Sequence, residues 1–411
     1  MEIFWIFAVI TILGLAGYGL QILAVCSYTS TSPLNSGEGN ALPRFFPTIS
    51  ILKPLKGLDD NLFDNLESFC NQEYPEYEII FPLQDHNDQA YKVARKIKEK
   101  YPDKDISIVV ERCDEGLNPK VNNLIPAYKI AKYQHILISD SNVMVDRNYL
   151  RDIAAPMSAP GVGLVSNLIR GTGGRSIGSV FENLHMNSFV ISSVCFLDKF
   201  LKMPCVVGKS MLMRQDDLEA IGGLKAFKDV LAEDYMIGKL MHEHGKKVVL
   251  SSHIIENVNH YWGLRKFINR HTRWGKLRWK IGGLKYLSEL LGNAVFMSSL
   301  PIVLWEPSKL TVSFALLVCL LKISGDYYVG RRVASDLNPF LYFLAPVKDL
   351  MIGLMWFVPL MSNTVVWRGN RYLIGKDSVL SPYHGDSLCA WRCKVADAIK
   401  TRNGVRQYQH L

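Results

Sequence analysis

The stretch YEIIFPLQD, residues 77–85, is a short apolar run that ends on a carboxylate. Four other short runs rich in isoleucine and valine are TISILKPL (48–55), DISIVVE (105–111), HILISDS (135–141) and KKVVLSSHIIE (246–256). Helix-patterned segments lie between them, such as DDNLFDNLESFCNQ (59–72) and NDQAYKVARKIKEK (87–100). Apolar strands without alternation, separated by helices, are typical of strands buried on both faces. We therefore predict an α/β domain over residues 47–261, with a mostly parallel sheet and helices on both faces.

The net charge and the cysteine content indicate the kind of partner and the redox compartment of this domain. The 411 residues carry a formal net charge of +9, which favours anionic partners without naming one. The eight cysteines lack metal-ligand spacing, apart from an isolated C-x₃-C at Cys389 and Cys393, which is a weak zinc signal. We expect reduced thiols in a domain that faces the cytosol.

A long apolar segment precedes the α/β domain. IFWIFAVITILGLAGYGLQILAV (3–25) has no charged residue and is long enough to cross a bilayer. It lacks the basic start of a cleaved signal peptide and is too long for one, so we predict a retained transmembrane helix over residues 1–28. A Gly/Ser/Pro/Asn-rich linker follows over residues 29–46.

Three more apolar runs follow the α/β domain, and they predict membrane helices over residues 286–362. The runs 286–305 and 310–321 are joined by a short turn and suggest a hairpin through the bilayer. The run 340–361 carries Lys348 and Asp349, which are costly in hydrocarbon, so it is either re-entrant or interfacial, or the pair faces protein. By the positive-inside rule the α/β domain and a tail over residues 363–411 face the cytoplasm, in a bacterial inner membrane or in a eukaryotic Golgi membrane.

Polar clusters follow several of the predicted strands. Asp85 and Asp88 follow the first quoted run, Asp140 ends another, and Asp234 begins a helical segment. Ligands of open parallel sheets bind beyond the carboxyl ends of the strands. Carboxylates at this position can bind a nucleobase, a ribose or a divalent metal ion, or can act as a general base. A single carboxylate is more often a helix cap or a solvated loop residue. Three such clusters in one domain predict a binding site.

The segment NRHTRWGKLRWK (269–280) interleaves cations with tryptophans at the edge of the apolar region. Nucleic acid, anionic lipid and a nucleotide diphosphate are possible partners. Apolar flanks and the lack of a groove-reading motif argue against nucleic acid. The basic and aromatic composition of residues 262–285 is typical of an interfacial helix.

Several motifs carry a resemblance to a known family. They are LQDHNDQA (83–90), GLNPKVNNLIPAY (116–128), ISDSN (138–142), GKSMLMRQDDLEAIGGL (208–224), AEDY (232–235) and RHTRW (270–274). In this order they resemble glycosyltransferase family 21, which includes ceramide glucosyltransferases and hopanoid-modifying relatives. The resemblance covers residues 47–285 and returns weakly in WRGNRY (367–372). It implies a GT-A fold and a membrane-bound, inverting enzyme that uses a UDP-sugar.

The resemblance implies a donor site and a metal site. Asp88 matches the family's uridine-contacting aspartate, with help from Asp85. Asp140 matches its metal-linked carboxylate, for Mg²⁺ or Mn²⁺. Asn142 stands where many relatives of the fold carry a second carboxylate, so the ion would depend on the diphosphate and water for its other ligands. Lys120 and Asn122 lie in NPKVNNL and form either a donor-site wall or a capped surface helix.

The resemblance also implies the catalytic residues. Asp234 matches the catalytic base, which takes the proton of an acceptor alcohol. Arg270, Arg273 and Trp274 match the R-x-x-R-W motif. Arg273 is expected on the diphosphate, because a guanidinium binds phosphate oxygens in pairs, and Trp274 at the acceptor mouth.

We predict transfer of glucose from UDP-glucose to the primary hydroxyl of ceramide or a ceramide-like lipid. The alternatives are a hopanoid glycosyltransferase that uses UDP-N-acetylglucosamine, a processive polysaccharide synthase and a non-enzymatic membrane scaffold. A synthase is expected to have more spanning segments and Gln in place of Arg270, and a scaffold to have lost some of these charged residues. The apolar segment 184–204 is either a ramp for the lipid or an ordinary buried helix.

Overall fold

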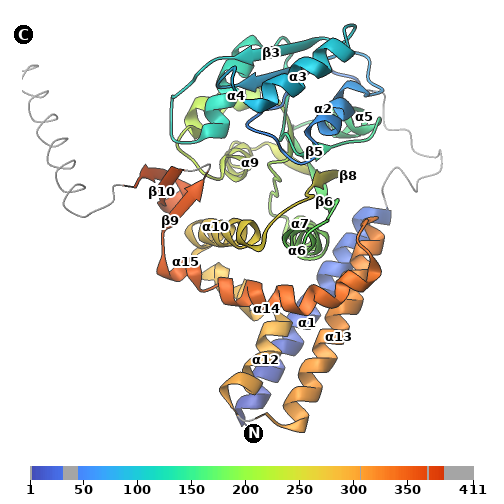
Figure 1. Ribbon diagram of the computed structural model, residues 1–411, viewed down its shortest axis with the longest axis vertical. Helices are drawn as coiled ribbons and strands as arrows, with labels where there is room; N and C mark the ends of the chain where they lie inside the picture. Colours follow the sequence, from blue (N-terminus) through green and yellow to red (C-terminus); the bar gives the residue numbers. More distant parts are fainter. Residues whose placement is uncertain (1, 31–44, 306, 368–369, 384–411) are drawn as a thin grey trace, which may run out of the picture.

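The computed structural model describes residues 2–30, 45–305, 307–367 and 370–383. Figure 1 shows an α/β unit at one end, a bundle of apolar helices at the other, and a layer of helices between them. Most of the predicted linker, the tail beyond residue 383, Cys389 and Cys393 lie outside the described residues. The six cysteines within them are free thiols.

The α/β unit contains an eight-stranded sheet with the order β3-β2-β1-β4-β7-β6-β8-β5. The strands are β1 (Ile49–Leu52), β2 (Tyr77–Leu83), β3 (Ile106–Val110), β4 (His135–Ser139), β5 (Val143–Met144), β6 (Val162–Thr172), β7 (Ser210–Arg214) and β8 (Lys247–Val258). Strands β1 to β4 are mutually parallel, and β6 is parallel to β8. Only β7 and β5 pair antiparallel with their neighbours. The sheet is therefore mostly parallel, which confirms the predicted α/β fold.

Alternate residues of the strands pack on opposite faces of the sheet. Ile49 and Ile51 of β1 join a core with α2 (Leu62–Cys70), α3 (Gln89–Lys100) and α5 (Tyr149–Ala154). Leu52 joins the opposite core, with α4 (Pro119–Ile130), α8 (Gln215–Ala220) and α9 (Glu233–Glu243). Since strand side chains alternate between faces, this division follows directly from the apolar runs.

In the part of the chain that the structure describes, three helical segments are long and apolar enough to cross a membrane: Phe4–Ser30 within α1 (Glu2–Ser30), α13 (Lys309–Arg332), and Pro339–Met361. The last contains α14 (Ala345–Met355) and α15 (Val358–Met361). Helix α12 (Ala294–Leu304) packs beside α1 and α13 but is only 11 residues long. At 1.5 Å per residue it spans about 16 Å, about half a bilayer core. A fourth span would need the preceding helices too, and these are bent from α12 by 68°.

Lys348 and Asp349 face protein, as one of the sequence alternatives proposed. Lys348 lies 2.8 Å from Asp349 and 3.8 Å from Asp326 of α13, and Lys322 pairs with both carboxylates. Two cations and two anions therefore balance one another in a buried cluster, which offsets their removal from water. Figure 1 shows α14 lying across the end of the α1–α12–α13 bundle. The interfacial placement of this segment stays a prediction.

The middle layer contains α6 (Ile177–His185), α7 (Ile191–Leu201) and α10 (Leu264–Gly282) (Figure 1). The short α11 (Leu287–Leu291) follows α10 and contacts α12 and α1. Beside the middle layer, a small antiparallel sheet is formed by β9 (Thr364–Trp367), β10 (Asn370–Ile374) and β11 (Leu380–Pro382). It is bound to the loop before α9, because the backbone N–H of Leu231 donates to the Ser378 carbonyl at 3.0 Å and that of Leu380 to the Asp229 carbonyl at 2.7 Å. The first part of the predicted tail over residues 363–411 thus folds onto the α/β unit, and its cytosolic location stays a prediction.

Candidate active site

A cavity of about 1500 Å³ opens at the carboxyl ends of the parallel strands. The segments that follow β1, β2, β3 and β4 line it, as do the residue before β7 and the start of α9. Helix α10 and the small sheet, through Trp367 and Tyr372, close the opposite side. Eight cationic and six anionic side chains line it: Lys56, Arg112, Lys120, Lys209, Arg265, Lys266, Arg270 and Arg273, and Asp59, Asp85, Asp114, Asp140, Glu233 and Asp234. The excess of cations suits an anionic ligand.

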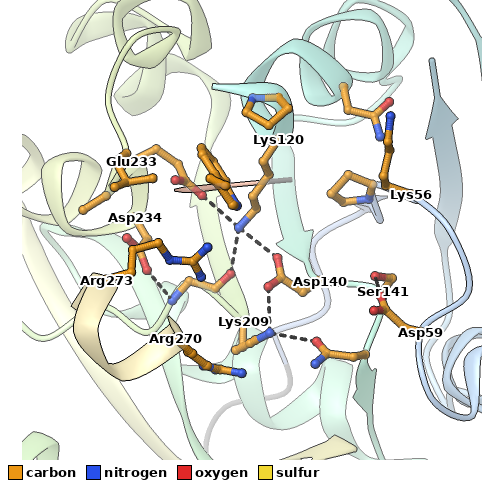
Figure 2. Close-up of a pocket in the computed structure, with 18 of the residues that line it drawn as sticks. Lys56, Asp59, Lys120, Asp140, Ser141, Lys209, Glu233, Asp234, Arg270 and Arg273 are labelled. Atoms are coloured by element: carbon orange, nitrogen blue, oxygen red, sulfur yellow. Dashed lines mark hydrogen bonds and ion pairs between the residues drawn. The ribbon is translucent and has the colours of Figure 1, made fainter. Parts of the chain in front are cut away.

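Asp140 lies in this cavity between two ammonium groups. Its Oδ1 is 2.9 Å from Lys120 Nζ, and its Oδ2 is 2.9 Å from Lys209 Nζ (Figure 2). Lys53, fully buried beneath it, donates to the Asp140 carbonyl at 2.7 Å. Burial raises the pKa of Asp140, but the two lysines outweigh burial and hold this pKa far below its usual value. Asp140 is therefore an anion with both oxygens already paired.

The predicted metal site at Asp140 does not fit this donor set. A divalent ion would have to displace an ammonium group, and the Asn142 Oδ1 that would accompany Asp140 accepts from Lys209 at 2.7 Å. Within the described residues no group of three or more His, Cys, Asp or Glu side chains could hold a metal ion through protein ligands alone.

Asp234 is held at the start of α9 by backbone donors. The N–H of Gly208 donates to its Oδ2 at 2.9 Å, and the N–H of Tyr235 to its Oδ1 at 2.8 Å. Burial, followed by the negative charge of Glu233, raises the pKa of Asp234 to about 6. A carboxylate with this pKa is ionised at neutral pH and is a stronger base than an ordinary aspartate.

The two aspartates after β2 differ in their positions. Asp85 lines the cavity, and its Oδ1 accepts from the Asn87 backbone N–H at 2.8 Å. Asp88 does not line the cavity: it caps α3 by accepting from the Ala90 N–H at 2.9 Å, and it accepts from the Gly57 N–H at 2.8 Å. The structure thus gives Asp88 a structural role, and its contact with a uridine stays a prediction.

The NPKVNNL segment forms a wall of the cavity and is also a capped helix. Asn118 caps α4 by accepting from the Lys120 and Val121 N–H groups at 2.8 and 3.1 Å. Asn122 exchanges hydrogen bonds with the backbone of Gly116 at 2.7 and 3.0 Å. Lys120 lies 2.9 Å from Glu233 as well as Asp140. Asn122 therefore fixes the conformation of the loop before α4, whereas Lys120 forms ion pairs with the carboxylates of the cavity.

The R-x-x-R-W residues all lie on α10 and line the cavity, but their surroundings differ. Arg270 pairs with Glu182 of α6, with 3.4 Å between Arg270 Nε and a carboxylate oxygen, and its guanidinium lies 4.3 Å from the Trp274 ring centroid. Arg273 lies 5.9 Å from the Trp367 ring, and Figure 2 shows its side chain directed into the cavity. Asp140, Asp234 and Arg273 therefore share one cavity, whereas Arg270 is bound to a buried carboxylate.

Sequence reasoning missed several residues that line the cavity or pair with residues that line it. Lys209 lies in the motif GKSMLMRQDD, to which no role was assigned. Its position directly before an apolar strand is the sequence feature that could have identified it as a site residue. Glu182, fully buried and 2.8 Å from His271 Nε2, had no signal in the sequence pattern. Trp367 lies in the weakly matching WRGNRY, of which Arg368 and Gly369 lie outside the described residues.

Comparisons with known proteins place the chain in a family. A model of glycosyl transferase family 21 matches residues 8–380. The protein is therefore a hexosyltransferase. More narrowly, the chain belongs to glycosyl transferase family 21.

Individual relatives carry related names. Ceramide glucosyltransferase 1 of Caenorhabditis elegans is 28% identical over 79% of this chain and 71% of its own length. Ceramide glucosyltransferase 3 of the same organism is 29% identical over 79% and 72%. A solved mannosyltransferase of Pyrobaculum calidifontis is similar over 86% of this chain and 98% of its own, with 15% identity and a TM-score of 0.49.

Proposed function

We propose that the protein transfers glucose from UDP-glucose to the primary hydroxyl of ceramide or a ceramide-like lipid. The observation that carries this proposal is the convergence of Asp140, Asp234 and Arg273, far apart in the sequence, on one cavity. Membership of family 21 and the names of the worm relatives support the lipid acceptor.

The transfer is a single displacement. Asp234 takes the proton of the acceptor hydroxyl as its oxygen forms a bond to the anomeric carbon. The bond from that carbon to the β-phosphate oxygen breaks, and its electron pair leaves with UDP. The configuration at the anomeric carbon is therefore inverted. Proton removal by a placed base contributes roughly 10²–10⁴-fold to the rate, and cations on the diphosphate stabilise the departing charge.

An amphiphilic acceptor suits the apolar surfaces beside the cavity. Val190 and Val194 of the segment 184–204 line the cavity. At the end of that segment Phe200, Leu201 and Met203 remain 44%, 52% and 42% exposed. The segment thus combines a buried helix with an exposed apolar tip, which allows a lipid chain to stay in the membrane while its hydroxyl reaches Asp234.

The decisive experiment supplies each donor with each acceptor. Membranes containing the full chain are incubated with UDP-glucose or UDP-N-acetylglucosamine and with ceramide or a hopanoid polyol, and the lipids are analysed by mass spectrometry. We expect glucosylceramide from the first pair. A product formed only from UDP-N-acetylglucosamine and the hopanoid would establish the alternative acceptor and donor, and a polymer would indicate a synthase.

Turnover is expected to depend on pH through Asp234. Because its pKa is raised to about 6, the base is lost by protonation as the pH falls through that value. The turnover number should fall about tenfold per pH unit below 6 and change little between 7 and 8. Glu233→Gln removes the neighbouring negative charge and should move the inflection to lower pH. A flat profile from pH 5 to 8 would contradict the assignment of the base.

A further inference from the structure

The space between Asp140 and Asn142 is filled by the ammonium group of Lys209. Its Nζ lies 2.9 Å from the Asp140 Oδ2 and 2.7 Å from the Asn142 Oδ1. The pairing of β4 with β7 explains this position, because Ser139 is directly opposite Ser210 in the antiparallel register. Asp140 and Lys209 therefore leave the two strands at the same point of the sheet edge.

The two lysines at Asp140 differ in their remaining hydrogen-bonding capacity. An ammonium group has three donors. Those of Lys120 meet Asp140 at 2.9 Å, Glu233 at 2.9 Å and the Gly208 carbonyl at 3.1 Å. Lys209 meets only Asp140 and Asn142 among the described residues. Its third N–H donor therefore remains for a ligand. The Lys209 side chain is only 15% exposed, and that exposure is to the cavity that it lines.

We infer that Lys209 binds the diphosphate of the donor in the place of a divalent metal ion, with Lys120 neutralising the carboxylates around it. The inference rests on the proposed function, since it assumes a nucleotide diphosphate in the cavity. Lys209 supplies a charge-assisted hydrogen bond to a phosphate oxygen. It holds the charge that develops there when the bond to the anomeric carbon breaks, and the electron pair stays on UDP.

Binding of UDP to the purified full chain in detergent tests the inference without requiring transfer. Calorimetry in EDTA is compared with calorimetry in Mn²⁺, and the electron paramagnetic resonance spectrum of Mn²⁺ reports whether the ion binds the protein with UDP present. We expect the same Kd for UDP in both conditions, within about twofold, and no protein-bound Mn²⁺ beyond that bound to free UDP.

Lys209→Met is the informative variant and Lys96→Met, on the exposed face of α3, is its control. Lys209→Met should weaken UDP binding in EDTA at least about tenfold, since one charge-assisted hydrogen bond is lost. Mn²⁺ should restore part of the affinity, because the Asp140–Asn142 pair is then open. The control should match the unmodified chain. If Lys209→Met fails to fold, the comparison of EDTA with Mn²⁺ on the unmodified chain decides alone.

Failure of the inference about Lys209 and failure of the proposed function give different results in this experiment. UDP binding that requires Mn²⁺, with the ion bound to the unmodified chain, would overturn the inference and leave the proposed function intact. Unchanged UDP affinity in a folded Lys209→Met variant would overturn it too. No UDP binding in either condition would contradict the proposed function itself.

Discussion

Asp234→Asn is expected to lower the turnover number for sugar transfer at least about a hundredfold while the Kd for the UDP-sugar changes little. The amide has nearly the shape of the carboxylate, and its oxygen can still accept from the Gly208 N–H that now donates to Asp234 at 2.9 Å. It cannot take a proton from the acceptor. Initial rates with saturating donor and acceptor, together with UDP-sugar calorimetry, separate the two effects.

The matched control is Asp103→Asn, because Asp103 lies exposed in the loop before β3. It changes the same charge by the same chemistry outside the cavity and should leave both quantities unchanged. Near-normal turnover of Asp234→Asn would remove this residue from the role of base, and a parallel loss of UDP-sugar affinity would make it a donor ligand instead.

The fold could be predicted because its signals are local. The apolar run at 77–85 and its counterparts specify strands buried on both faces, and packing of Ile49 and Ile51 opposite Leu52 follows from strand geometry alone. The N-terminal helix followed from the absence of charge over residues 3–25. Neither prediction required knowledge of which strands are neighbours.

The site was predicted in part, since its chemistry depends on neighbours. Asp140 and Asp234 were recognised at element ends, and both line the cavity. That Lys209 occupies the supposed metal position depends on the register of β4 against β7, which the sequence pattern does not contain. The cap formed by Asp88 was equally hidden, because a capping aspartate and a ligand-binding one look the same in the sequence.

The small C-terminal sheet is a second feature that depends on long-range contacts and was therefore not predicted. Its strands are short and were expected to belong to a tail. They are stabilised by hydrogen bonds to the backbone around Leu231, directly before the helix that carries Asp234. This sheet also brings Trp367 to the cavity, 5.9 Å from Arg273. A segment far along the chain thus completes the catalytic domain through long-range contacts.

Arg273→Lys is expected to lower turnover about 10²–10³-fold and to lower thermal stability less than Arg270→Lys does, because it removes the planar guanidinium that we propose binds the leaving diphosphate. Arg270→Lys should behave in the opposite way. Its guanidinium faces the fully buried Glu182, whose pKa is raised by burial but lowered further by Arg270 and His271.

A lysine at 270 would match that carboxylate less well, so we expect a lower melting temperature in detergent and a smaller loss of turnover. The two conservative variants differ only in their position on one helix, three residues apart. Melting curves and initial rates measured on both separate a group that acts on the substrate from one that holds α10 against α6. A turnover loss larger for Arg270→Lys, with melting unchanged, would exchange the two roles.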